Sequence, residues 1–491
     1  MSVARHTSYS LAGSAAPVLV SLVTVPIYLK TIGFERYGVL SICWLLLGYF
    51  NLFDIGLGRA TAHRIATLYD GRPEQRNAVL WTALALSAGL ALLAVILFAP
   101  AAHIAMAYVE SGEASGEIGQ ALPWLVAAVP LGICAGVLNG ALEGRRAFLS
   151  LNAISTSGTT ALAMAPLAVA LLAGPKLAYL LAAAFVARLI TVGGLLAMCR
   201  VNVPLMRPRF IERREVHSLL TFGGWMTLSN IVNPLLAVGE RFAIGALISA
   251  AAVAIYVVPL GLILQALILP SALSTALFPK LASSSVDDGR TLAETSIRVL
   301  ALVLMPLCFV GLALVEPFLN LWLGASTASK SIPIAQILVV GFWMNSLARI
   351  AYTKLQATAR PRLIALVHLG ELLPYMVLLY VLMRLFGVAG AAIAWSLRCA
   401  ADAALLYSVS GLRRDLLPPL AIQTLAIVGA VGAFLSFSHG SLMRWLVTLA
   451  CLLIAFGALA FPSMQVRSVA ELLRSVITSY RPPKAISDGG L

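Results

Sequence analysis

The sequence predicts an all-α polytopic membrane protein with about 14 transmembrane helices. Of its 491 residues, 60% are hydrophobic and 11% are charged, whereas soluble domains average roughly 45–50% apolar and 25% charged residues. Apolar stretches of about 20 residues, which a helix needs to cross the hydrocarbon layer, recur along the chain. Two of them, 77–102 and 118–142, contain no formal charge. Transmembrane β-strands would be alternating segments of about ten residues, so we expect helices.

The expected spans start close to the N-terminus. The first follows only Arg5 and His6 and has no small-residue cleavage pattern behind it, so we interpret it as a span rather than a signal peptide. The eighth is longer than one crossing requires, and Pro259 and Pro270 can bend or break it. The expected spans are 8–29, 37–57, 77–100, 120–142, 150–173, 177–199, 216–238, 243–278, 299–319, 332–350, 362–383, 386–408, 416–437 and 444–463.

The basic residues predict the orientation of the chain. Most of the 34 Lys and Arg residues lie in the N-terminus, in every second loop and in the C-terminal tail. Cytoplasmic loops of membrane proteins are enriched in Lys and Arg, so both termini are expected in the cytoplasm. The formal charge of +14 therefore indicates orientation, and no nucleic acid partner is expected. The opposite loops hold Lys30, Arg36, Lys176, Arg241, Lys330, Arg384 and Arg444.

The longest hydrophilic cytoplasmic connection, 200–215, divides the first twelve spans into two sets of six. Each set opens with a span that contains small residues and proline, which suggests parallel repeats that rock about a central cavity. We therefore expect two six-helix bundles around a cavity, followed by two further helices. The corresponding domains are 1–199, the linker 200–215, 216–411, the helices of 412–463 and a cytoplasmic tail at 464–491.

Cofactor chemistry is not indicated by the sequence. The six cysteines lie in or at the ends of apolar segments without paired spacing, so neither disulfides nor a zinc site are predicted. No Walker phosphate loop is present, so direct ATP binding is not expected. The longest loop on the opposite side, about 101–119, carries Glu110, Glu113 and Glu117, which are most simply solvated. It lacks a catalytic constellation, which disfavours a membrane-integral polysaccharide polymerase.

Two blocks of sequence resemble a known family. The first block comprises Tyr28-Leu29-Lys30, Gly33, Tyr37-Gly38 and the segment LFDIGLG at 52–58. The second comprises Leu355-Gln356-Ala357, Arg360-Pro361, His368-Leu369-Gly370-Glu371-Leu372, Pro374-Tyr375, Gly387, Gly390-Ala391-Ala392, Ala394-Trp395, Leu397-Arg398 and Asp402. With these blocks, the chain resembles bacterial oligosaccharide (O-antigen type) flippases of the polysaccharide-transporter family. That family belongs to the multidrug/oligosaccharidyl-lipid/polysaccharide exporter superfamily.

The resemblance implies a flippase of the bacterial inner membrane. Its substrate would be an oligosaccharide linked to undecaprenyl diphosphate, moved from the cytoplasmic to the periplasmic leaflet for surface polysaccharide assembly. Membrane lipids and polysaccharide-assembly proteins are the partners it implies, and an H⁺ or Na⁺ gradient could drive the cycle. Sugar hydroxyls cost roughly 2–7 kcal/mol each to strip of hydrogen bonds, so the headgroup needs a polar, hydrated cavity. The competing hypothesis is an antiporter of drugs or organic cations from the same superfamily.

Arg188 is the leading candidate for substrate binding, because it lies well inside its span. An Arg at a helix centre costs roughly 2.5–3.5 kcal/mol on insertion scales, so it is expected to face a cavity or a partner. It could bind the diphosphate, or pair with Asp54 or a backbone carbonyl. Arg59 is a second cavity candidate, although it and Asp54 could instead form a structural pair at a glycine-rich helix end. Asn230 and Asn233 could bond sugar hydroxyls or satisfy backbone freed by proline.

Four charged residues of the eleventh and twelfth spans form the remaining hypothesis. His368 and Glu371 lie three residues apart on one helical face, and Arg398 and Asp402 lie four apart on the next span. A Glu371–Arg398–Asp402 network would neutralise charges that are costly in lipid. Alternatively, His368 and Glu371 could exchange a proton during transport, since histidine titrates near neutrality. The sequence leaves both readings open.

Overall fold

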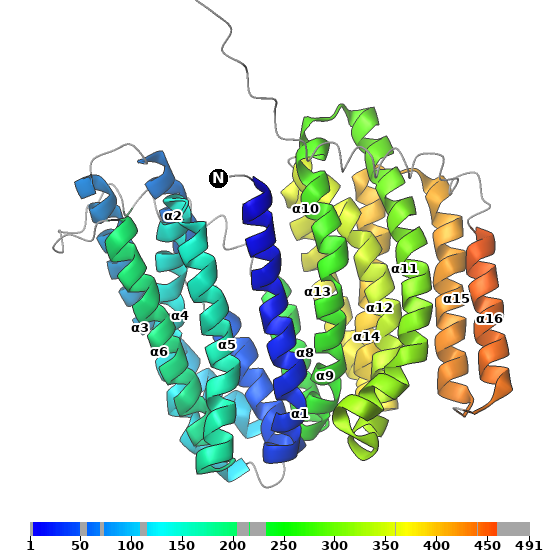
Figure 1. Ribbon diagram of the computed structural model, residues 1–491, viewed down its shortest axis with the longest axis horizontal. Coiled ribbons are helices and arrows are strands. Elements are labelled where there is room, and N and C mark those ends of the chain that lie inside the picture. Colours follow the sequence, from blue (N-terminus) through cyan, green and yellow to red (C-terminus); the bar gives the residue numbers. More distant parts are fainter. Residues whose placement is uncertain are drawn as a thin grey trace, which may run out of the picture. The chain divides into compact units, whose positions relative to one another are not determined.

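A computed structural model describes residues 3–49, 56–68, 73–108, 115–203, 216, 232–358, 360–438 and 440–458. The secondary structure in these ranges is helical, without strands (Figure 1). Ten of the described helices are long and apolar enough to cross a membrane, judged by length and composition. The predicted all-helical membrane class is confirmed, while the count of 14 spans stays a prediction.

The chain forms two compact units. The first comprises Met1–Val258 with Met383–Val388. Within it, α4 packs against α2, α3 and α6, while α5 packs against α1 and α6. Leu57, Leu80, Val137, Leu142 and Cys199 belong to the buried core shared by α2, α3, α4 and α6. Its helices are α1 (Val3–Tyr49), α2 (Leu57–Thr67), α3 (Pro73–Tyr108), α4 (Ser115–Gly144), α5 (Phe148–Ala173), α6 (Leu177–Asn202) and α8 (Val232–Leu247).

The second unit comprises Pro259–Leu382 with Ala389–Leu491, and α9 runs from the first unit into it. Here α12 packs against α10, α11 and α15, and α15 packs against α16. The paired α15 and α16 can be followed in orange to red in Figure 1. The predicted division into two six-helix bundles stays a prediction. The helices are α9 (Ala250–Ala266), α10 (Ile268–Ser283), α11 (Val286–Leu323), α12 (Ala325–Ala357), α13 (Pro361–Phe386), α14 (Val388–Ser410), the 3₁₀ turn Arg414–Leu416, α15 (Leu417–Ser436) and α16 (Leu442–Gly457).

Some helix breaks agree with the expected boundaries and others differ. The break expected between the first two spans lies at Gly33, where two helices that together make up α1 meet at a kink with a φ of 76° and a ψ of 173°. Glycine adopts this positive φ without the steric cost that a side chain would add. The predicted eighth span, 243–278, is not one helix, because α8, α9 and α10 end and restart within it. Pro270 lies in the first turn of α10, where proline is tolerated.

Helix α11 starts at Val286, well before the expected residue 299. The Ser285 hydroxyl caps it by accepting a hydrogen bond from the Asp288 backbone N–H at 3.2 Å. Asp287 and Asp288 place carboxylates in the first turn, where the helix dipole favours negative charge. The helix therefore includes Arg290, Glu294 and Arg298, which the sequence-based boundaries leave in a loop.

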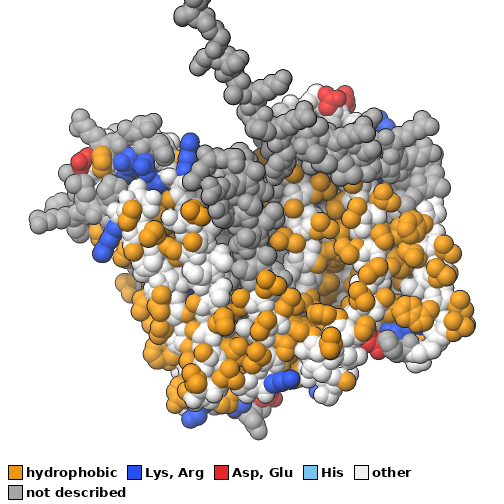
Figure 2. Space-filling view, viewed as in Figure 1, with side chains coloured by type: hydrophobic (Ala, Val, Ile, Leu, Met, Phe, Trp, Pro, Cys, Tyr) orange, Lys and Arg blue, Asp and Glu red, His pale blue; other side chains and the backbone are white. Residues whose placement is uncertain are grey.

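Apolar side chains cover much of the visible helix sides, whereas charged side chains gather near the helix ends (Figure 2). Large apolar residues in the middle of helices are strongly exposed, with Leu92 of α3 at 64% and Ile190 of α6 at 69%. Soluble monomers rarely expose contiguous apolar surfaces of this kind. The surface therefore fits contact with lipid chains, as the hydropathy of the sequence predicts.

Candidate functional site

A cluster of charged and aromatic side chains lies within three membrane-spanning helices of the second unit. We call it the α12–α14 cluster. Ions inside a membrane span are costly, and those that persist mark pathways, relays or paired networks. Its members are Arg349 and Tyr352 of α12, His368, Glu371 and Tyr375 of α13, and Arg398 and Asp402 of α14.

Two ion pairs join α13 to α14 within this cluster. His368 Nε2 lies 3.4 Å from Asp402 Oδ1, and Arg398 Nη1 lies 3.9 Å from Glu371 Oε2. The first pair is ionic only when the imidazole is protonated. The structure thus brings together all four residues singled out by the sequence, and it pairs Asp402 with His368 where the expected network links it to Arg398.

Aromatic rings hold the cluster's basic groups in place. The Tyr352 ring stacks on the His368 imidazole, with centroids 6.2 Å apart and planes inclined by 14°. Gln356 Nε2 donates a hydrogen bond to the Tyr352 hydroxyl at 3.0 Å. The Arg398 guanidinium lies 5.4 Å from the Tyr375 ring centroid, a distance that allows a cation–π interaction. The His368 imidazole is therefore positioned by Tyr352 on α12 as well as by Asp402 on α14.

Glu371 is the least satisfied member of the cluster. Glu371 is 5% exposed, and both of its carboxylate oxygens are buried without a hydrogen-bond partner in the described part of the chain. The Arg398 contact at 3.9 Å is an ion pair that is too long for a hydrogen bond. A buried carboxylate in this state is stabilised by a proton, a cation or water. A proton or a small cation would therefore stabilise this arrangement.

The candidates of the first unit are only partly brought together. Arg188 lies half-buried in α6, beside the buried Ala187. Arg59 Nη1 lies 3.3 Å from Glu143 Oε1, and these side chains are 63% and 41% exposed. Asp54 and Asn230 lie outside the described residues. Asn233 lies in α8, and its side chain is likewise outside the description.

Sequence reasoning missed a charged latch that joins α1, α4 and α6. Arg36 donates to both carboxylate oxygens of Glu117, from Nη2 at 2.8 Å and from Nε at 3.2 Å. The Leu177 backbone N–H adds a third hydrogen bond to Glu117 at 3.0 Å. The expectation that Glu117 is solvated is therefore wrong, because these helix ends meet. The sequence did contain a signal for this pair, because Arg36 and Glu117 are both predicted on the side of the membrane opposite to the termini.

A second missed pair joins α11 to α16. Arg444 Nη2 donates to Glu316 Oε2 at 2.8 Å, and the arginine side chain is 2% exposed. Its guanidinium lies 4.1 Å from the Phe434 ring centroid. The sequence analysis counts Arg444 among the basic residues of the loops, whereas the packing of α16 buries its side chain.

Comparison with known proteins places the chain in a family. The family model described as "Polysaccharide biosynthesis protein" matches residues 32–332. A Shigella flexneri protein named "Putative O-antigen transporter" is 30% identical over 410 residues, which covers 83% of this chain and 97% of that relative. The sequence resemblance thus extends over most of both proteins.

Solved structures share the fold at low sequence identity. An inward-facing multidrug resistance MATE family transporter matches with a TM-score of 0.67 and 16% identity, covering 82% of this chain and 95% of that one. The lipid II flippase MurJ in an inward closed conformation matches with a TM-score of 0.66 and 12% identity, covering 96% and 100%. The chain therefore belongs to the polysaccharide biosynthesis protein family, in agreement with the family that its sequence blocks resemble.

Proposed function

We propose that this protein flips an undecaprenyl-diphosphate-linked oligosaccharide from the cytoplasmic to the periplasmic leaflet of the bacterial inner membrane. The conclusion depends chiefly on the 30% identity to an O-antigen transporter across 97% of that relative. The fold shared with a lipid II flippase supports it, since lipid II is also a lipid-linked saccharide. The named relatives are transporters rather than enzymes, so the polymerase alternative falls away.

The transport cycle proposed here is alternating access between two helical bundles. The diphosphate and the sugars need polar surroundings, while the prenyl chain stays in lipid. Arg188 is the proposed diphosphate contact, because a cation inside a span can pair with phosphate oxygens by charge-assisted hydrogen bonds. Arg59, Asn230 and Asn233 stay candidates for further contacts to the headgroup. The electropositive cavity between the bundles is part of this proposal.

The α12–α14 cluster is the proposed site of ion coupling. Glu371 has buried oxygens that a proton or Na⁺ would satisfy, and a proton on the His368 imidazole would complete an ion pair with Asp402, 3.4 Å away. Uptake of H⁺ or Na⁺ there would change the charge balance among α12, α13 and α14. The structural alternative, in which Arg398 and Glu371 only neutralise each other, predicts no dependence of transport on the ion gradient.

Deletion of the gene tests the proposed substrate. We expect loss of surface polysaccharide, together with accumulation of lipid-linked repeat units that face the cytoplasm. A plasmid copy of the gene should restore both properties. Hypersensitivity to drugs or organic cations with normal surface polysaccharide would instead support the antiporter hypothesis and overturn the flippase proposal.

A further inference from the structure

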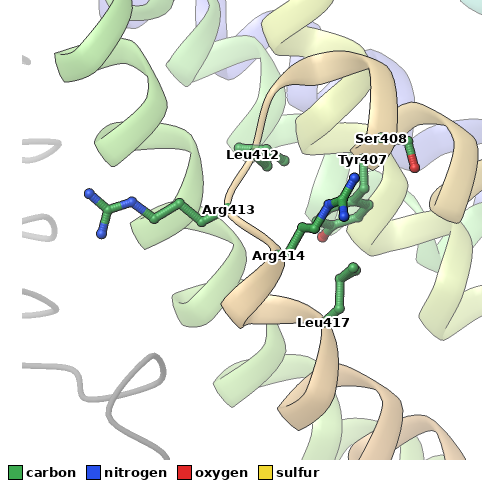
Figure 3. Close-up of a pocket in the computed structure, with 6 residues that line it drawn as sticks. All are labelled: Tyr407, Ser408, Leu412, Arg413, Arg414 and Leu417. Carbon is green, nitrogen blue, oxygen red and sulfur yellow. The ribbon is translucent and has the colours of Figure 1, made fainter.

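A small pocket lies where α14 ends and α15 begins in the second unit (Figure 3). Its volume is about 90 Å³, which leaves room for a few water molecules or one phosphate group and too little for a sugar chain. Both flanking helices are long and apolar enough to cross a membrane. The pocket therefore lies at the level of a membrane surface. It is lined by Tyr407, Ser408, Leu412, Arg413, Arg414 and Leu417.

The pocket contains a hydrogen-bond donor that nothing in the described part of the chain uses. Tyr407 is 6% exposed, and its hydroxyl is buried without a hydrogen-bond partner among the described residues. Buried hydroxyl groups are normally paired, since an unmade hydrogen bond costs about 1–3 kcal/mol. An anionic oxygen in the pocket would accept this hydrogen bond.

Arg414 supplies the positive charge of the pocket. In Figure 3 the Arg414 side chain lies beside Tyr407, whereas the Arg413 side chain extends away from the other lining residues. A guanidinium and a hydroxyl that converge on one small volume suit a phosphate group, whose oxygens accept hydrogen bonds from both.

The surrounding charges fix this corner of the unit and leave it positive. Glu294 is 3% exposed and accepts a hydrogen bond from the Arg413 backbone N–H at 3.0 Å. Arg290 and Arg298 each lie 3.9 Å from Glu294 oxygens. Arg290 Nε also donates to the Gly411 carbonyl at 2.7 Å, and Gly411 makes the turn with a φ of 70°. Glu294 therefore anchors the linker between several guanidinium groups, and the other carboxylate of this turn, Asp415, is exposed.

We propose that this pocket binds the phosphate group of an anionic phospholipid. Basic pockets between spanning helices at the membrane surface are known to hold anionic lipid headgroups. Leu417, 44% exposed at the start of α15, offers an apolar surface beside the charges for the first part of an acyl chain. The lipid would tie α14 to α15. The inference is independent of the proposed flippase function, because it concerns lipid binding and not the transported substrate.

Lipid binding to the purified full-length protein tests the proposal. The probes are phosphatidylglycerol, phosphatidylethanolamine and inorganic phosphate, each added to protein in detergent and measured by native mass spectrometry and by the thermal unfolding midpoint. We expect phosphatidylglycerol to bind and to raise the midpoint, and Arg414→Gln to weaken binding about tenfold, the loss expected for a charge-assisted hydrogen bond. The matched control is Arg362→Gln, which removes the same charge from an exposed position at the start of α13, outside the pocket lining, and should keep the affinity.

Tyr407→Phe separates a ligand site from a packing position. Without lipid, the variant should unfold at the same temperature or slightly higher, because it removes an unpaired buried hydroxyl. With phosphatidylglycerol, its affinity should fall several-fold. Equal losses in Arg362→Gln and Arg414→Gln would overturn the proposal, since they would indicate general surface charge. Stabilisation by inorganic phosphate alone would overturn the assignment to a lipid, and unchanged binding in Tyr407→Phe would exclude the hydroxyl as a ligand.

Discussion

The imidazole of His368 lies 3.4 Å from the carboxylate of Asp402, one helix away. Three residues further along α13, Glu371 has two buried oxygens without a hydrogen bond in the described structure. A proton on His368 would complete an ion pair, and a proton on Glu371 would remove an ill-satisfied buried charge. A proton would therefore stabilise each of these neighbouring groups in a different way, which is the basis for proposing the cluster as the site of ion coupling.

Glu371→Gln should abolish the dependence of transport on an ion gradient. Glutamine keeps the shape of the side chain and removes its charge, so Arg398 loses its partner and the coupling ion loses its ligand. In vesicles, gradient-driven flipping of a fluorescent lipid-linked saccharide should fall to the rate measured without a gradient. Glu143→Gln, which removes an exposed carboxylate, is the control and should keep the gradient dependence. If Glu371→Gln kept it as well, the cluster would be structural.

The Arg36–Glu117 latch should contribute measurably to stability. These side chains are 22% and 21% exposed and are joined by two hydrogen bonds. A double-mutant cycle with Arg36→Gln and Glu117→Gln should give a coupling energy of about 1–2 kcal/mol, as expected for a partly buried, charge-assisted pair. The exposed Arg59–Glu143 pair should give about 0.5 kcal/mol or less. Equal coupling energies for the two pairs would contradict this argument.

Membrane class and family were predictable from the sequence, because both depend on local information. Each span needs only its own run of apolar residues, and the blocks at 28–58 and 355–402 carry the family resemblance. Helix boundaries were predictable only in part. The gap expected between the first two spans contains the kink at Gly33. The early start of α11 was missed, because it depends on a cap at Ser285, which does not change the hydropathy of the segment.

Individual charged residues of the site were also predictable, but their partners were not. His368, Glu371, Arg398 and Asp402 are conspicuous because they interrupt apolar spans. Their pairing needs the relative rotation of α13 and α14, which periodicity does not supply. The latch residues Arg36 and Glu117 are separated by 81 positions, so only the assembled first unit brings them together. Tyr407 was missed because a tyrosine at a helix end is an ordinary feature of membrane proteins.

Gly38→Ala should destabilise the first unit. A Cβ atom at Gly38 would overlap the Ala250 carbonyl, because α1 and the start of α9 approach closely there. The backbone cannot shift as a flexible side chain can, so we expect the free energy of unfolding to fall by about 1–3 kcal/mol, typical of overpacking. Gly48→Ala on the same helix is the control, since nothing lies within 4 Å of its new Cβ. It should be neutral or stabilising in thermal unfolding measurements.

Arg188→Ala should impair flipping without reducing the amount of protein in the membrane. The side chain is half-buried in α6, and its proposed role is to attract the substrate diphosphate. Arg200→Ala, at the exposed end of the same helix, removes an equal charge and should leave transport unchanged. Cellular accumulation of lipid-linked repeat units and immunoblots of membranes supply the two measurements. Normal flipping in Arg188→Ala would remove the proposed role of Arg188. A reduced amount of the variant protein, both in cells and in vesicles that contain no substrate, would indicate a structural role instead.

Arg444→Met should loosen α16 from the rest of the second unit. Arg444 is 2% exposed, pairs with Glu316 at 2.8 Å and lies over Phe434, so methionine would remove this hydrogen-bonded ion pair from a partly buried carboxylate. Breaking such a pair from one side costs about 3–5 kcal/mol, whereas removing both charges is far less harmful. The double variant Arg444→Met with Glu316→Gln should therefore recover most of the unfolding midpoint lost in the single variant. No recovery would mean that Arg444 acts chiefly through its contact with the Phe434 ring.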